Sequence, residues 1–265
     1  MHPAKDALCS TKVVYQLFHK RVKLANTVFH VDSAVDLEWG HALSSFQAEE
    51  EPHVKVFLRY AAPGEDVGYR KVVKMEDGYY IYIPQSLYTQ LSARHVLTML
   101  PIEEILMEQG TLVLHSSFVL CQNQAILFSG PSGIGKSTQG DLWAAYADGT
   151  VINGDRALVT PLDDGVQVDS HFLSGTSGIC TNAQARLNAI VLLEQGPENV
   201  ISQIRPLDRF KKLLCQVSYY PDNNYQRIRV TELLEKLLCK ANVCQITSRK
   251  DETAVRCLKE YLFEQ

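Results

Sequence analysis

The residues whose types and spacing best suit chemistry lie at 130–138, which read Gly-Pro-Ser-Gly-Ile-Gly-Lys-Ser-Thr. They match the phosphate-binding loop GxxxxGK[ST], the Walker A motif, with Gly130, Gly135, Lys136 and Ser137 at the fixed positions. Glycines let the backbone curve around an anion, and a helix that begins at Lys136 adds a partial positive charge. The lysine can reach the β- and γ-phosphates, and the serine hydroxyl is a ligand for Mg²⁺.

This motif predicts a nucleotide-binding site with ATP and Mg²⁺ as cofactors. The residues that we expect to contact the nucleotide are Gly130, Ser132, Gly133, Ile134, Gly135, Lys136, Ser137 and Thr138. The local context fits, because an apolar strand pattern at 125–130 precedes the loop and helical spacing at 136–147 follows it. A glycine turn that happens to precede Lys-Ser is the alternative.

A second ligand for Mg²⁺ is expected at the end of a neighbouring apolar strand. Asp155 follows the strand-like run 150–154 and lies 19 residues after Lys136, which leaves room for one helix and one strand. We therefore predict that Ser137 and Asp155 are the metal ligands, although Asp155 could merely cap the turn into Arg156. The chain has neither the Asn-Lys-x-Asp motif of GTPases nor the Leu-Ser-Gly-Gly-Gln signature of transporter ATPases.

Segment 114–159 has a histidine before the loop and an acidic residue at the end of the strand that follows it. This segment resembles the HPr kinase/phosphorylase-like family of the phosphoenolpyruvate carboxykinase superfamily. It is most similar to small bacterial HPr-kinase-related proteins that lack the HPr kinase N-terminal domain. Weaker likeness continues through 174–178 and 187–207, so the resemblance covers about half of the chain in patches. It implies a phosphoenolpyruvate-carboxykinase-like P-loop core.

The resemblance also implies roles for single residues. Lys136 would bind phosphates, Ser137 and Asp155 would bind Mg²⁺, and His115 would belong to the catalytic centre. HPr kinases have two consecutive Asp residues at the strand end, and the first is assigned as the base that activates the acceptor serine. Gly154 stands at that position here.

His115 is therefore a candidate to accept the proton of the acceptor hydroxyl, or to orient that hydroxyl, at the γ-phosphate end of the site. A hairpin of 111–120 and 125–130 around Gln122-Asn123 would pair residues whose numbers sum to about 245, which places His115 opposite Gly130. An imidazole with its ordinary pKa near 6.5 can accept a proton at neutral pH. The alternative is that His115 only hydrogen-bonds the loop backbone.

The sequence favours an ATP- and Mg²⁺-dependent kinase, HPr-kinase-like, that phosphorylates a hydroxyl, and the resemblance implies that a serine of a small protein or peptide is the acceptor. One alternative is a small-molecule kinase, for example one for free serine. Another is a nucleotide-binding module with little catalysis, which Gly154 supports. Arg156 and Arg186 are candidates to stabilise the transferred phosphoryl group, or else surface ion-pair partners. The predicted catalytic residues are His115, Lys136, Asp155 and Arg156.

The elements around the site are expected to form an α/β fold with a mixed sheet. We predict an N-terminal β-containing subdomain at 1–110 and a P-loop kinase-like core at 111–265. The expected strands outside the loop region are 54–60, two runs within 71–84, two within 156–171, 187–195, 201–207 and 243–248. The expected helices are 93–110 with a kink or a break at Pro101, 208–219, 224–241 and 251–264.

Composition restricts the partners. The 265 residues carry a net charge of -4 and contain 46% hydrophobic residues, without an apolar run of 18, so neither a membrane nor a nucleic acid is expected as partner.

Seven cysteines without a CxxC pair and no signal peptide predict reduced thiols in a cytoplasmic protein. The oligomeric state stays open, a homo-oligomer included. Five histidines show no ligand spacing: His19, His30, His41, His53 and His95.

Overall fold

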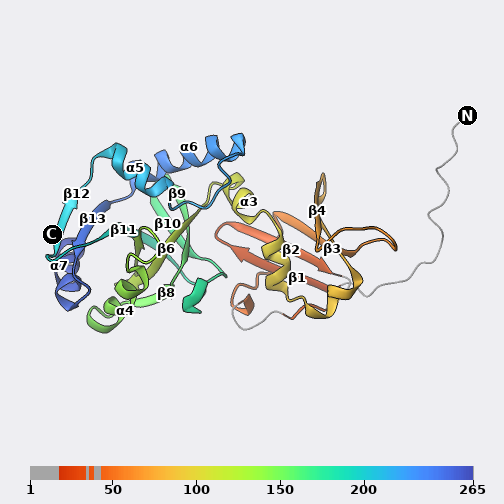
Figure 1. Ribbon diagram of the computed structural model, residues 1–265, viewed down its shortest axis with the longest axis horizontal. Coiled ribbons are helices and arrows are strands. Elements are labelled where there is room, and N and C mark those ends of the chain that lie inside the picture. The colour runs from red at the N-terminus through yellow and green to blue at the C-terminus, as the bar shows by residue number, and fades with distance from the viewer. Residues whose placement is uncertain (1–17, 34–35, 39–42, 265) are drawn as a thin grey trace, which may run out of the picture.

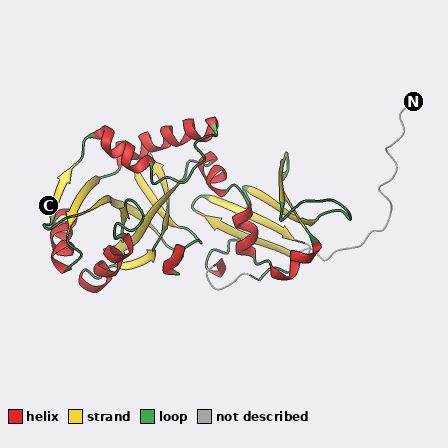
Figure 2. Cartoon of the chain, in the orientation of Figure 1, coloured by secondary structure: helices red, strands yellow, loops and turns green. Residues whose placement is uncertain are grey.

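A computed structural model describes residues 18–33, 36–38 and 43–264 (Figures 1 and 2). These residues form an α/β protein with two mixed sheets. The smaller sheet has the strand order β1-β2-β3-β5-β4, in which the β2–β3 and β3–β5 pairs are parallel and the outer pairs are antiparallel. Its strands are β1 (Phe18–Leu24), β2 (Thr27–Ser33), β3 (Val54–Tyr60), β4 (Lys71–Met75) and β5 (Gly78–Ile83).

The smaller sheet confirms the predicted strand at 54–60 and the predicted hairpin within 71–84. Helices follow as η1 (Gln85–Gln90), α2 (Ala93–Met99) and α3 (Ile102–Glu108). The predicted break at Pro101 is confirmed, because this residue is the N-cap of α3. The core under α2 and α3 also includes Val113, Leu158 and Phe172, so apolar packing continues into the second sheet.

The larger sheet has the order β10-β9-β6-β7-β11-β13-β12, with β8 paired to β6. Its strands are β6 (Leu112–Cys121), β7 (Gln124–Ser129), β8 (Thr150–Asn153), β9 (Arg156–Leu162), β10 (Gly165–Ser170), β11 (Gln184–Gln195), β12 (Val200–Gln203) and β13 (Val243–Ser248). An additional antiparallel pairing of β10 with β11 closes the five strands β10, β9, β6, β7 and β11 into a ring. Neighbours β7, β11 and β13 are parallel.

Helices cover two sides of this sheet, as Figure 1 shows. On one side, α4 (Lys136–Tyr146) packs against β6, β7, β8 and α7 (Glu252–Phe263), in a core that contains Trp143, Phe128 and Val255. On the other side, α6 (Asn224–Lys240) buries Val230, Leu234 and Leu237. The remaining helices are α5 (Pro206–Leu214) and the short η2 (Gly175–Ser177).

Two predicted boundaries at 201–219 are wrong. The strand predicted for 201–207 ends at Gln203, because Pro206 begins α5; proline lacks the N–H of a strand ladder and suits the first helical turn. The helix predicted for 208–219 ends at Leu214, because residues 216–218 instead run beside β6: Gln216 O accepts from His115 N at 2.8 Å. The division into two domains at residue 110 stays a prediction.

Candidate functional site

The loop at 130–135 joins the C-terminal end of buried strand β7 to the first turn of α4. Gly135 is the N-cap of α4 and has φ +117°, and Gly130 has φ +150°, both conformations that side chains rarely adopt. A Cβ at Gly130 would also lie 3.3 Å from the Ile134 side chain. The predicted strand and helix are thus present on either side of segment 130–135.

Lys136 is folded back over this loop and is only 8% exposed. Its ammonium donates hydrogen bonds to Gly130 O at 2.9 Å and Pro131 O at 3.3 Å. Burial lowers the pKa of Lys136, and the nearby carboxylate of Asp155 opposes that effect. The lysine is therefore held in a fixed place inside the loop.

A pocket of about 290 Å³ opens at the N-terminus of α4. It brings together residues from the loop, from β6, from the β8–β9 turn and from the segment around η2. The lining residues are His115, Ser132, Gly133, Gly135, Lys136, Ser137, Thr138, Gly154, Asp155, Ser174, Thr176, Ser177 and Lys250. Two predicted nucleotide contacts, Gly130 and Ile134, instead line a neighbouring cavity of about 470 Å³ on the other side of the loop.

His115 reaches the pocket as its strand register predicts. Ser116 pairs with Ser129, so residue numbers sum to 245 and His115 lies level with Gly130. The Ser129 hydroxyl donates to His115 O at 3.1 Å, which ties the two strand ends together. His115 Nε2 lies 3.2 Å from Asp155 Oδ1. Burial, followed by Lys136, lowers the pKa of His115 and outweighs Asp155, so the imidazole is neutral at pH 7.

The fully buried side chain of Asn153, at the end of β8, holds Asp155 in place. Asn153 Oδ1 accepts hydrogen bonds from the backbone N–H groups of Asp155 at 2.9 Å and Arg156 at 3.0 Å. The backbone N–H of Ser116 donates to Asp155 O at 3.0 Å. On its other side, the Asn153 amide donates to the carbonyls of two residues that lead to η2, His171 at 2.7 Å and Leu173 at 2.9 Å. One side chain thus joins two walls of the pocket.

The carboxylate of Asp155 has two neighbours. Oδ1 meets His115, and Oδ2 lies 3.2 Å from Arg156 Nε. Each carboxylate oxygen has two lone pairs, so both oxygens keep acceptor capacity, and Asp155 lines the same pocket as Ser137. Oxygen donors of this kind are what Mg²⁺ requires, and the residues present therefore fit that ion.

Gly154 has a packing reason to lack a side chain. A Cβ there would collide with the Ser177 hydroxyl, which in turn donates to Ser174 O at 2.8 Å. Gly175 is similarly constrained: it has φ +57°, and a Cβ would lie 2.7 Å from Asp155 Cγ. The segment 174–178, a stretch of weaker family likeness by sequence, is therefore packed directly against Asp155.

The two arginines singled out by sequence lie elsewhere. Arg156 faces Asp155 and, at 3.7 Å, Glu103 of α3, and it does not line the described pocket. Arg186 on β11 pairs with Asp164 in the β9–β10 turn. Their roles at the transferred phosphoryl group stay predictions. Lys250, which does line the pocket, was missed because no motif surrounds it in the sequence.

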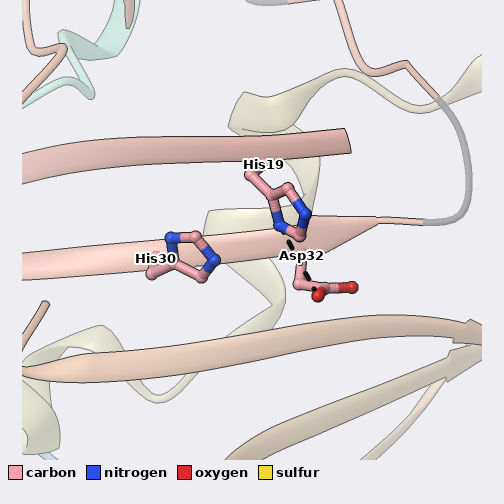
Figure 3. Close-up of side chains that lie close together, drawn as sticks. All are labelled: His19, His30 and Asp32. Carbon is pink, nitrogen blue, oxygen red and sulfur yellow. Dashed lines mark ion pairs between the residues drawn. The ribbon is translucent and has the colours of Figure 1, made fainter. Parts of the chain in front are cut away.

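A separate group of potential metal ligands lies on the smaller sheet (Figure 3). Strand pairing places His19 opposite Asp32 and near His30, with ligand atoms within 4.8 Å of one another, a grouping that spacing did not predict. However, Arg59 already bonds the Asp32 carboxylate at 2.8 Å. Burial and the positive groups Arg21 and Lys55, among others, lower the pKa of His30. This positive surrounding opposes cation binding, and we assign no metal here.

Comparisons with known proteins add little to this geometry. No protein-family model matches the chain, and no curated protein matches it. Among solved structures, the HPr(Ser) kinase/phosphatase from Coxiella burnetii is similar at a TM-score of 0.24 and 13% identity, over 46% of this chain and 88% of that one. We draw no functional argument from a likeness at that TM-score. No helix within the described ranges is long and apolar enough to cross a membrane.

Proposed function

We propose that this chain is an ATP- and Mg²⁺-dependent phosphotransferase, HPr-kinase-like, that transfers the γ-phosphoryl group to a hydroxyl. The observation that carries the proposal is the convergence of Lys136, Ser137 and Asp155 on one pocket at the N-terminus of α4. Lys136 and Ser137 begin α4, whereas Asp155 follows β8, and together they supply the cation and the two oxygen ligands that a Mg²⁺-nucleotide requires.

In this proposal, the backbone N–H groups of the loop and Lys136 bind the phosphates, and Ser137 and Asp155 hold the metal. Bound Mg²⁺ supplies neutralisation of the charge on the β- and γ-phosphates. The chain itself then has to position the acceptor hydroxyl and accept its proton.

We assign His115 the role of the base that accepts the proton of the acceptor hydroxyl. Its Nε2–H donates to Asp155 Oδ1, which leaves the lone pair of Nδ1 free to accept the proton of the attacking hydroxyl. The lowered pKa of His115 keeps the imidazole neutral and therefore competent as a base at pH 7. Gly154 has no side chain to do this work. The acceptor in our proposal is a serine hydroxyl of a small protein or peptide, with free serine as the small-molecule alternative.

One observation favours a second candidate, a nucleotide-binding module with little catalysis. None of the described residues that line the pocket is an arginine, since Arg156 is engaged by Asp155 and Glu103. A site without that extra cation has less to stabilise the transferred phosphoryl group.

The test is transfer of the labelled γ-phosphoryl group from ATP, with Mg²⁺, to serine-containing peptides and to free serine in separate reactions. We expect transfer by the wild type and none by Asp155→Asn, which keeps the size of the side chain but loses the charge that a hard cation needs. Asp148→Asn is the control, because Asp148 is exposed and its φ of +54° suits Asn equally well.

The two acceptors distinguish the peptide kinase from the small-molecule kinase. ATP binding without transfer to any acceptor would favour the binding module. Full activity of Asp155→Asn would show that Asp155 only caps its turn.

A further inference from the structure

Lys250 lies between β13 and α7, and it lines the same pocket as Lys136 although the two are far apart in the sequence. We infer that Lys250 is a second phosphate-binding cation, which contacts the α/β-phosphate part of the nucleotide. This inference rests on the proposed function and adds to it a residue that determines nucleotide affinity.

The position of Lys250 over Gly135 is the first observation. A Cβ built at Gly135 would lie 3.1 Å from Lys250 Cε and 3.6 Å from its Nζ. Gly135 is the N-cap of α4, so the end of the Lys250 side chain lies close to the helix N-terminus. In phosphate-binding loops the backbone N–H groups hold the α- and β-phosphates, whereas the loop lysine reaches the β- and γ-phosphates. Lys250 is therefore on the α/β side.

The residues on either side of Lys250 are anchored. The backbone N–H of Arg249 donates to Asn199 Oδ1 at 3.0 Å, and its guanidinium donates to Pro197 O. Asp251 caps α7 by accepting from the backbone N–H of Thr253 at 3.0 Å. These bonds fix the backbone from which the lysine side chain extends.

The ammonium of Lys250 itself is uncommitted. Within residues 18–33, 36–38 and 43–264, it forms no hydrogen bond and no ion pair, whereas Lys136 is bonded to loop carbonyls. The lysine is exposed at the pocket, where a polyphosphate would be its natural anion. The charges of Lys136 and Lys250 exceed the single negative charge of Asp155 among the lining residues, which favours an anionic ligand.

The experiment is titration calorimetry of ATP and of ADP, each with Mg²⁺, against the wild type, Lys250→Met and Lys250→Arg. Since the contact is exposed, we expect Lys250→Met to weaken both nucleotides equally, by about fivefold, and the loss to shrink at high salt. Lys250→Arg should keep most of the affinity. The control is Lys236→Met, because Lys236 is an exposed lysine of α6 outside the pocket and its loss should change nothing.

The result also separates the inference from the proposed function. Lys136→Met is measured alongside, and a melting curve confirms that each variant is folded. If Lys136→Met loses affinity while Lys250→Met binds ADP like the wild type, the inference is wrong and the proposed function stands. A loss for ATP without a loss for ADP would place Lys250 at the γ-phosphate and also overturn the inference. If the wild type binds neither nucleotide, both fail.

Discussion

Asn153 offers the sharpest test of how the site is held together. Its side chain is fully buried and forms four hydrogen bonds, two to N–H groups at 155 and 156 and two to carbonyls at 171 and 173. The carbonyl of His171 also accepts from Cys180 Sγ at 3.1 Å, so Asn153→Ala leaves that carbonyl with a donor but removes the Asn153 hydrogen bond of the other three groups. A buried polar group left unpaired costs about 1–3 kcal/mol.

Because such losses are not additive, we expect Asn153→Ala to lower the free energy of unfolding by about 3–4 kcal/mol. Asn153→Asp keeps the acceptor for both N–H groups but turns a carboxylate oxygen toward the two carbonyls. Burial and those carbonyls would raise the pKa of the new carboxyl in the folded state. The deficit relative to the wild type should therefore be large at pH 7 and shrink as the pH falls to 5, where a proton restores one of the two donated hydrogen bonds.

The assay is urea unfolding of the wild type and both variants at pH 7 and pH 5. Asn224→Asp is the matched control, because Asn224 is exposed and its oxygen already accepts from Arg227 at 2.8 Å, a bond that a carboxylate keeps. A cost below about 1 kcal/mol for Asn153→Ala, or a pH-independent deficit for Asn153→Asp, would refute this account of the turn.

Two further predictions concern titratable groups. His115→Gln should lower the rate of phosphoryl transfer about 10²–10⁴-fold with nearly unchanged ATP affinity. The wild-type rate should fall only when the pH drops below the ordinary imidazole pKa, because burial and Lys136 lower the pKa of His115. Full turnover by the variant, with a flat pH profile, would make His115 structural. Burial raises the pKa of Asp169 from 3.8 in the unfolded chain to about 6 in the folded protein, because the buried site favours the protonated carboxyl. The contribution of Asp169 to the free energy of unfolding is therefore highest below pH 3.8 and falls as the pH rises through 6. Asp169→Asn should therefore stabilise the fold by up to about 3 kcal/mol above pH 6 and by little near pH 4 in urea unfolding, and an equal effect at both pH values would contradict it.

Local sequence patterns predicted the parts of the site that lie close together in the chain. The motif at 130–138 fixed where β7 ends and α4 begins, since glycine spacing and a buried apolar run are both local signals. The short connection at Gln122-Asn123 set the strand register, and that register placed His115 beside the loop. Asp155 followed from the end of a short apolar strand.

Other parts depend on contacts between distant segments. Strands β1 and β2 were not predicted, because β1 mixes charged and apolar residues and β2 is buried on nearly all positions, so neither shows the simple alternation of a half-buried strand. The ring closure between β10 and β11 has no local signature. Arg156, a candidate for the phosphoryl group or for an ion pair by sequence, lies near Glu103 of α3, a contact between distant segments that no local pattern signals.

Segment 130–138 is expected to bind the phosphates of a nucleotide. The most direct test is calorimetric titration of ATP with Mg²⁺ into the wild type, Lys136→Ala and the control Lys236→Ala. Lys136 is the one full charge held inside the loop itself, and a charge-assisted bond contributes about 1.5–3 kcal/mol. We predict that the wild type and the control bind ATP alike and that Lys136→Ala binds it at least about tenfold more weakly. Unchanged affinity in a folded Lys136→Ala variant, or no binding by the wild type, would contradict the account.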